Sequence, residues 1–255
     1  MRRVTFDVAA DLYGRFMGRF SEPLAVAFVD AVGIAPARTA LDVGCGPGAL
    51  TAVLVDVLGV DQVAAADPSA PFVAAVGDRL PGLDVRLAPA EDLPFADDGV
   101  DLALAQLVVH FMTDPVAGLR EMARVTRPGG RVAANVWDYE GRTGPLTTFW
   151  DAVQDLDPAH PGEGLRAGTR KGHLVSLLRA AGLREVTGGR IAVTSRFGSF
   201  EEWWEPYTYG VGPAGAHVAA LEPAARERLR AHCASLLPAP PFDVDAAAWC
   251  AVGVV

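Results

Sequence analysis

Residues 40–51 read ALDVGCGPGALT, an apolar run that contains one acid and passes directly into three alternating glycines. An apolar run that ends at such a turn predicts a buried strand over residues 39–43, followed by a helix over 49–58. Glycine has no Cβ atom, so Gly44 and Gly46 permit left-handed backbone angles and let a ligand approach the chain closely. The stretch therefore predicts a strand, a tight turn and a helix, with a ligand beside the turn.

Strands and helices continue to alternate after this unit. The expected strands lie at residues 62–66, 84–88, 100–108 and 130–137, and the expected helices at 70–80 and about 115–125. Buried strands that read as continuous apolar runs and alternate with helices are typical of a mainly parallel sheet. The first half of the chain is therefore predicted to be a doubly wound α/β structure.

The second half of the chain is less regular. Residues 138–168 lose the periodic pattern and are rich in Gly, Pro, Thr and acidic residues, which is typical of a loop or lid. Beyond them we expect a helix at 170–181, a strand at 183–195, an amphipathic helix at 223–237 and a final strand. We interpret residues 1–255 as one domain, with a cofactor-binding core at 1–137, lid insertions within 138–245 and the final strand at about 246–255.

Composition and charge narrow the classes of partner. Of the residues 51% are hydrophobic and 21% are charged, which is typical of a globular protein. The net charge of −9 makes nucleic acid and anionic membrane surfaces unsuitable partners, because both are bound through clustered cations. Three cysteines without CxxC spacing predict neither a disulfide framework nor a metal site. We expect a cytoplasmic protein without a secretion signal, since Asp7 and Asp11 interrupt the opening segment.

The glycine turn alone is compatible with two cofactors. A dinucleotide fingerprint would use the same glycines, with Asp67 as the ribose acid at the end of the second strand. Pyrophosphate, however, would bring negative charge beside Asp42, and Pro47 removes one backbone N–H from the anion-binding turn. S-adenosylmethionine (SAM) has no phosphate and carries a cationic sulfonium and amino group, so Asp42 favours it. These charges favour SAM over NAD(P).

The stretch ALDVGCGPGALT resembles motif I of the class I SAM-dependent methyltransferases, in particular the small-molecule group called methyltransferase type 11. Other stretches agree with that family: YGRFMGRFS at 13–21, AAADPS at 64–69, PAEDLPFADDGVDLALA at 89–105 and REMARVTRPGGRV at 120–132. The resemblance extends over about residues 10–137. It implies a Rossmann-like, seven-stranded, mostly parallel sheet whose last or near-last strand is antiparallel, with a helical or loop lid in the C-terminal half.

The resemblance also implies which residues contact the cofactor. The methionyl part is assigned to Gly44, Cys45, Gly46, Gln106 and Leu107, the ribose diol to Asp67, and the adenine to Pro68, Ala90 and Glu91. Tyr13 and Arg19 are assigned to the N-terminal segment that reaches the cofactor, with Arg19 suited to its carboxylate. One position departs from the family pattern, because Pro89 stands where many relatives carry an acid that accepts from the adenine amino group.

The function implied is methyl transfer from SAM to a small-molecule acceptor with an O, N or C nucleophile, leaving S-adenosylhomocysteine as product. The chain would act as a monomer or homodimer. An NAD(P)-dependent oxidoreductase and a SAM-binding protein without methyl-transfer activity are the alternatives. His110, just after the fourth strand, is a candidate general base, although a lone histidine at a strand exit is often a packing residue. Aromatic residues between 197 and 209 would line a pocket or pack a lid helix.

Overall fold

The structure is a computed structural model that describes residues 10–35, 37–164 and 166–255. Its sheet has seven strands in the order β3-β2-β1-β4-β5-β7-β6. The strands are β1 (Ala40–Val43), β2 (Val63–Asp67), β3 (Asp84–Leu87), β4 (Val100–Gln106), β5 (Thr126–Trp137), β6 (Arg184–Phe197) and β7 (Phe242–Val254). β7 runs antiparallel to β5 and β6, whereas the other neighbouring strands are parallel. The predicted seven-stranded, mostly parallel sheet with an antiparallel last strand is confirmed.

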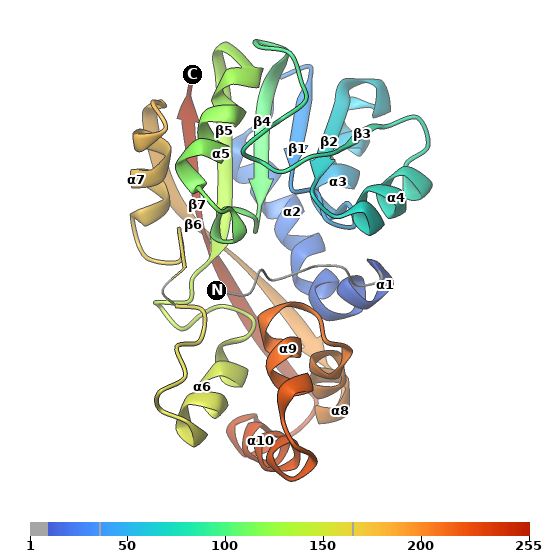
Figure 1. Cartoon of the computed structure of the whole chain (residues 1–255), viewed down its shortest axis with the longest axis vertical. Coiled ribbons are helices and arrows are strands. Elements are labelled where there is room, and N and C mark those ends of the chain that lie inside the picture. The colour runs from blue at the N-terminus through green and yellow to red at the C-terminus, as the bar shows by residue number, and fades with distance from the viewer. Residues whose placement is uncertain (1–9, 36, 165) are drawn as a thin grey trace.

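Helices cover both faces of this sheet (Figure 1). The N-terminal helices are α1 (Ala10–Tyr13), a π-helical turn at Gly14–Gly18, and α2 (Arg19–Val32). The helices that follow in the core are α3 (Ala49–Leu58), α4 (Ala70–Arg79), α5 (Pro115–Val125) and α7 (His173–Ala180). Hydrophobic residues of α2 and α3 pack on one face of the sheet, and those of α5 and α7 pack on the other. The arrangement is therefore doubly wound.

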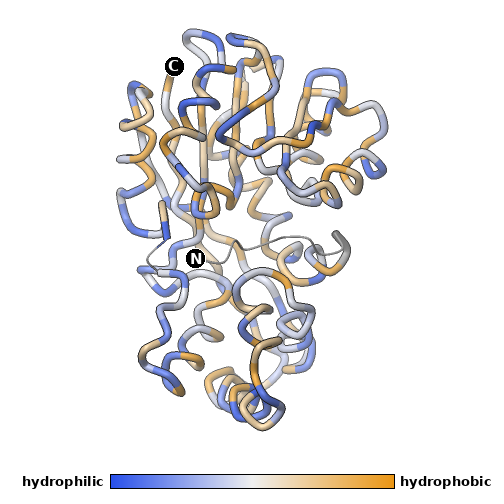
Figure 2. The backbone as a smooth tube through the Cα atoms, viewed as in Figure 1, coloured by the Kyte–Doolittle hydropathy of each residue, from blue (hydrophilic) through white to orange (hydrophobic). Residues whose placement is uncertain are grey.

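The central strand β4 shows why the middle of such a strand, Leu102–Ala105, is apolar on both faces. Leu102 and Leu104 pack on the side of α2 and α3, whereas Ala103 and Ala105 pack on the side of α5. Successive side chains of a strand point to opposite faces, so a strand covered on both faces needs apolar residues at every position. Figure 2 shows the same contrast between hydrophobic strands inside the sheet and hydrophilic loops at its ends.

A group of helices, which we call the lid, lies against the edge at which the parallel strands end (Figure 1). It consists of α6 (Thr147–Leu156), α8 (Phe200–Trp204), α9 (Gly212–Ala220), α10 (Pro223–Leu236) and the adjoining ends of β6 and β7. The sequence predicted a loop or lid over residues 138–168, and α6 lies within this segment. This helix has only ten residues, but it buries Phe149, Trp150 and Val153, so packing against the lid stabilises it.

The aromatic residues between 197 and 209 pack the inside of the lid. Phe197, Trp203 and Tyr207 are at most 3% exposed, and the Tyr207 ring stacks on Phe149 at 4.5 Å between centroids. The packing interpretation of this cluster therefore holds, although three of its members also line a small cavity beside the larger one described below. Across the described part of the chain, no helix combines the length and apolar character needed to cross a membrane.

Candidate active site

The turn between β1 and α3 holds three glycines with positive φ angles, namely 72° at Gly44, 53° at Gly46 and 89° at Gly48. A Cβ atom at Gly44 would lie 2.5 Å from a methyl carbon of Val108, which is a severe overlap. At Gly46, by contrast, a Cβ atom would meet nothing within 4 Å. The first glycine is therefore required for packing within the protein. The second leaves open space beside the backbone, as a ligand that lies on this turn requires.

Asp67 ends β2 and faces the same turn. Its Oδ2 accepts a hydrogen bond from the Gly46 N–H at 2.9 Å, and its Oδ1 accepts one from the Ser69 N–H at 2.8 Å. Burial raises the pKa of this carboxyl, and the two backbone bonds oppose that rise. Each carboxylate oxygen keeps a further lone pair. Asp67 is thus fixed in orientation and able to accept two ligand hydroxyls, as the ribose diol would require.

Asp42 lies in β1, one residue earlier in the chain than the last residue of the strand. It is 1% exposed, and its Oδ2 accepts the Thr51 hydroxyl at 2.6 Å. Its Oδ1 has no hydrogen-bond partner among the described residues. Burial raises the pKa of Asp42 to about 7, and the nearby charge of Asp67 adds to the rise. A cationic ligand would restore the ionised form, whereas a phosphate would oppose it, so the electrostatics of the turn favour a cation.

Tyr13 brings the N-terminal segment to the same place. Its ring packs edge-on against Phe72 of α4 at 5.4 Å, and burial together with Asp67 raises the pKa of its hydroxyl to about 12. Pro68 follows Asp67 and is exposed. Cys45 is buried, and burial raises the pKa of its thiol well above the usual value. Cys45 is therefore a small packing residue of the turn and not a reactive thiolate.

Arg19 faces the lid. Its guanidinium forms an ion pair with Glu202 at 2.7 Å, donates to the Arg196 carbonyl at 3.2 Å and lies 4.3 Å from the centroid of the Phe197 ring. Because these contacts hold the side chain against β6 and α8, Arg19 joins the N-terminal helix to the lid in this structure. Its assignment to the cofactor carboxylate stays a prediction.

The two residues assigned to the adenine edge lie in the loop before β4. Glu91 Oε1 accepts from the Thr113 and Asp114 N–H groups, at 2.7 Å and 3.2 Å, and so holds this loop to the start of α5. Ala90 is buried, close to the position that a Cβ atom on Gly118 would occupy. Glu91 therefore already accepts hydrogen bonds from the protein backbone, and adenine would have to share this carboxylate with them.

The two assigned residues at the end of β4 have different surroundings. Gln106 is buried, and its side-chain amide donates to the Ser21 carbonyl of α2 at 2.9 Å. Leu107 adopts a φ of 62°, which is unusual for a residue other than glycine, and Asn135 holds its backbone N–H. Strained backbone of this kind is frequent at functional sites. It places the Leu107 side chain in a cavity next to the turn.

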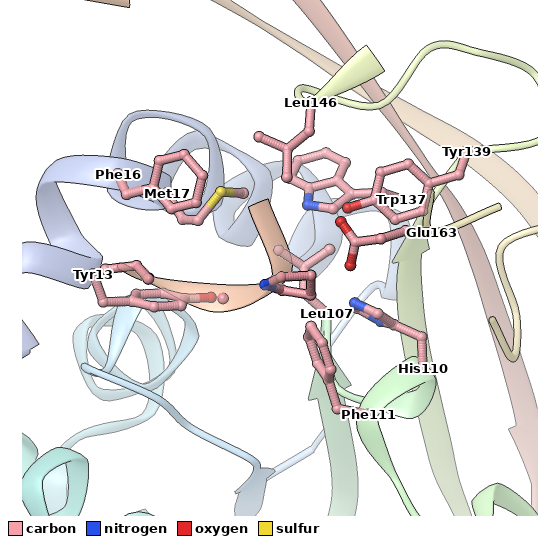
Figure 3. A pocket seen from close by; sticks show the side chains of 13 residues that line it. Tyr13, Phe16, Met17, Leu107, His110, Phe111, Trp137, Tyr139, Leu146 and Glu163 are labelled. Carbon is pink, nitrogen blue, oxygen red and sulfur yellow. The ribbon is translucent and has the colours of Figure 1, made fainter. Parts of the chain in front are cut away.

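This cavity has a volume of about 40 Å³ and lies between the ends of β4 and β5, the N-terminal segment and the lid (Figure 3). Most of its walls are aromatic or aliphatic. The lining residues are Tyr13, Phe16, Met17, Leu107, His110, Phe111, Trp137, Tyr139, Leu146, Glu163, Val211, Gly212 and Pro213. The structure thus brings Tyr13, Leu107 and His110 together, as three of the predicted site residues.

Two ionisable side chains face one another across the polar side of the cavity (Figure 3). His110 is 6% exposed, and burial together with the charge of Arg166 lowers its pKa to about 3, so the imidazole is neutral at physiological pH. Glu163 is 3% exposed, and its Oε2 accepts the Trp150 indole N–H at 3.0 Å. The Tyr139 hydroxyl also bonds to this carboxylate, whose Oε1 lies 3.4 Å from the Arg166 Nε. Burial raises the pKa of Glu163.

Sequence reasoning missed Trp137, Tyr139 and Glu163. Trp137 is the last residue of β5, and side chains at this edge of a parallel sheet are candidates for ligand contacts, so its position could have indicated it. Tyr139 follows two residues later and shares that signal. Glu163 lies in a segment without periodicity and is placed by Trp150 and Arg166, so no local pattern points to it.

Known proteins resemble this chain in sequence. A sequence model described as a methyltransferase domain matches residues 41–134. A demethylmenaquinone methyltransferase of Beutenbergia cavernae is 33% identical over 185 residues, which are 66% of this chain and 76% of that protein. An uncharacterised methyltransferase of Mycobacterium tuberculosis is 33% identical over 80% of this chain and 78% of its own length. Other matches span less: 34% of a transposon protein of Streptomyces fradiae and 61% of another M. tuberculosis methyltransferase.

Solved structures show the same fold at low sequence identity. The geranyl diphosphate C-methyltransferase of Streptomyces coelicolor, determined with S-adenosylhomocysteine, superposes with a TM-score of 0.54 at 14% identity and covers 93% of this chain and 80% of that one. The [4+2]-cyclase SpnF superposes with a TM-score of 0.55 at 20% identity and covers 91% and 80%. At such identities the likeness concerns the fold alone. The matches in sequence, together with the glycine turn and its two acids, place this chain in the class I SAM-dependent methyltransferase family.

Proposed function

We propose that the chain transfers the methyl group of SAM to a small-molecule acceptor held in the cavity beneath the lid. The observation that carries this proposal is that the cavity lies close to the glycine turn, because Tyr13 lines the cavity and is near enough to Asp67 for that carboxylate to raise its pKa. The turn supplies open space and two acids, and the cavity supplies apolar walls with a few polar groups, a combination typical of small-molecule sites.

The residues of the turn fit SAM. Asp67 would accept the ribose hydroxyls, the open side of Gly46 would take the methionyl part, and Asp42 would balance the cationic groups. When bound, SAM supplies a methyl group whose bond to the sulfonium breaks with both electrons left on sulfur, so that S-adenosylhomocysteine remains. NAD(P) fits less well, because its pyrophosphate would lie against Asp42, whose ionisation burial already opposes.

His110 is the residue that we propose as proton acceptor. Its Nδ1 is buried, has no hydrogen-bond partner among the described residues, and belongs to a side chain that lines the cavity. A neutral imidazole can accept a hydrogen bond from an O–H or N–H nucleophile. Its pKa of about 3 in the ligand-free chain makes it a weak base, so it takes the proton only when the bound ligands raise that pKa. The apolar walls, among them Phe16 and Leu107, would exclude water and hold the acceptor in line for transfer.

Calorimetric titration tests the cofactor. The purified chain is titrated with SAM, S-adenosylhomocysteine and NADH, and we expect binding of the two adenosyl ligands without a response to NADH. Asp67→Ala should weaken SAM binding by about 1–3 kcal/mol, because it removes two hydrogen bonds to a charged acceptor. Asp78→Ala, on the exposed side of α4, is the matched control and should leave the affinity unchanged.

Each other outcome has a definite meaning. Binding of NADH alone would replace the proposal with an NAD(P)-dependent oxidoreductase. An Asp67→Ala variant that binds SAM as the unaltered chain does would remove Asp67 from the site. Formation of S-adenosylhomocysteine that depends on an added acceptor would separate a methyltransferase from a protein that binds SAM without transferring its methyl group.

A further inference from the structure

Unpaired polar atoms gather in the cavity. Among the described residues, eight buried side-chain nitrogen or oxygen atoms have no hydrogen-bond partner, and three of the eight belong to residues that line this one cavity. They are His110 Nδ1, Trp137 Nε1 and Glu163 Oε1, the last of which lies 3.4 Å from the Arg166 Nε but makes no hydrogen bond. A buried polar atom left without a partner costs about 1–3 kcal/mol, so native structures seldom keep several together. The cluster therefore points to a ligand that pairs with them.

The three atoms require complementary groups on that ligand. The Trp137 indole nitrogen is a donor only, and the Glu163 carboxylate oxygen is an acceptor. His110 is neutral, so its Nδ1 offers a lone pair when Nε2 carries the proton. With the proton of His110 on Nε2, the cavity presents two acceptors and one donor. A single hydroxyl donates only one hydrogen bond and would leave one acceptor unpaired, whereas two hydroxyls can pair with all three atoms.

The remaining walls define the shape and charge of the ligand. Rings of Phe16, Phe111, Trp137 and Tyr13 surround the cavity (Figure 3), and aromatic faces of this kind favour a flat partner. The charge of Glu163 is balanced by Arg166, whose guanidinium also lies 5.2 Å from the centroid of the Phe111 ring. A charged methyl acceptor would therefore lose its hydration on binding, and the cavity would offer it no unpaired opposite charge.

On the basis of the proposed function, we propose that the methyl acceptor is an uncharged aromatic ring with two hydroxyl groups, and that Glu163 determines this specificity. One hydroxyl lies between His110 and the Trp137 N–H, and the other donates to Glu163. Trp150, which lies outside the cavity lining, donates to the other oxygen of this carboxylate and holds it in place. Glu163 is then a residue of acceptor recognition, separate from the residues that hold the cofactor at the turn.

Binding of simple probes tests this assignment. The full chain, saturated with S-adenosylhomocysteine, is titrated calorimetrically with catechol, hydroquinone, phenol, cyclohexane-1,2-diol and benzoate. We expect catechol or hydroquinone to bind at least tenfold more tightly than phenol, which lacks the second hydroxyl. The same margin is expected over cyclohexane-1,2-diol, which lacks the flat ring, and over benzoate, which is charged. The same probes are titrated without S-adenosylhomocysteine as well.

Glu163→Gln tests the residue itself. In this variant the Trp150 N–H should donate to the side-chain amide oxygen, as it does to the carboxylate. The amide NH₂ then faces the cavity, so a hydrogen-bond donor replaces the acceptor. The preference for the two-hydroxyl probe over phenol should fall below threefold, with the affinity for S-adenosylhomocysteine unchanged. Glu140→Gln, in the exposed loop after β5, is the matched control and should keep the preference. Trp137→Phe is a second variant, and it should weaken all hydroxylated probes alike.

The outcomes separate the two proposals. Equal binding of phenol, tightest binding of benzoate, or a preference that survives Glu163→Gln would overturn the acceptor assignment while SAM binding stands. A chain that binds no S-adenosylhomocysteine would instead overturn the proposed function. The titrations without that ligand then show whether the cavity still selects the two-hydroxyl ring, and an absence of such selection would overturn the acceptor assignment too.

Discussion

Replacement of two neighbouring glycines by alanine is expected to damage the protein in two different ways. Alanine at Gly44 must adopt a φ near 72° and places its Cβ 2.5 Å from Val108. The left-handed backbone costs about 1–2 kcal/mol, and overpacking adds about 1–3 kcal/mol. Gly44→Ala should therefore lower the free energy of unfolding by about 2–5 kcal/mol, a large share of the roughly 5–15 kcal/mol of an ordinary domain.

Gly46→Ala has the same backbone cost but no overlap, because a Cβ atom there meets nothing within 4 Å. Its free energy of unfolding should fall by only about 1–2 kcal/mol. The added methyl group would occupy the open space that we assign to the methionyl part of SAM. The affinity for S-adenosylhomocysteine should therefore fall at least tenfold, although this variant is the more stable of the two.

Urea unfolding of the ligand-free variants and calorimetric titration with S-adenosylhomocysteine measure the two effects. Val108→Ala in the Gly44→Ala background isolates the overlap, and a double-mutant cycle should return a favourable coupling of about 1–3 kcal/mol. Two results would refute the reasoning. One is a Gly44→Ala chain as stable as Gly46→Ala. The other is a Gly46→Ala chain that binds S-adenosylhomocysteine as tightly as the unaltered protein.

Two predictions concern pH. Burial raises the pKa of Asp42 to about 7, so this carboxyl keeps its proton in the folded chain. In the unfolded chain it is ionised above about pH 4. Asp42 therefore makes the ligand-free fold less stable as the pH rises from about 4 to 7. Asp42→Asn should flatten that loss in urea titrations, and it should also abolish the rise in affinity for S-adenosylhomocysteine that calorimetry is expected to show between pH 6 and 8. His110, with its pKa lowered to about 3, destabilises the fold as pH falls below about 6.5, because the unfolded chain takes up the proton first. His110→Gln should lose less stability than the unaltered chain between pH 7 and 5, and an equal loss would show that the imidazole is not buried.

The cofactor side of the site could be predicted because its determinants are local. Asp42, Gly44 and Gly46 lie within five residues, and Asp67 ends the strand that pairs directly with theirs. Alternation of apolar strands with helices then predicts the parallel register that brings the two strand ends together. Physical rules that act over a few residues were sufficient to place the glycine turn and Asp67 at the same edge of the sheet, and their binding of SAM stays a prediction.

The acceptor side is not local. Its cavity takes Phe16 from the N-terminal π-helical turn, Trp137 from the end of β5, Glu163 from an irregular loop and Val211 from the lid. Short lid helices such as α6 have little helical preference of their own and are stabilised by tertiary packing. Periodicity along the chain therefore indicates neither where these residues meet nor which of their polar atoms stay unpaired.

Different kinds of contact hold the glycine turn and Glu163. The turn is fixed by close packing at Gly44, where a Cβ atom would not fit, and by the backbone hydrogen bond to Asp67. Glu163, by contrast, depends on side-chain contacts with Trp150 and Arg166, both of which belong to the lid or the loop that joins it. A substitution at Trp150 should therefore move Glu163 and change which acceptor is bound, yet leave the affinity for S-adenosylhomocysteine unaltered. On the two proposals, binding of the cofactor and choice of the acceptor rest on separate sets of contacts, so we expect acceptor specificity to change through the lid while the cofactor turn is kept.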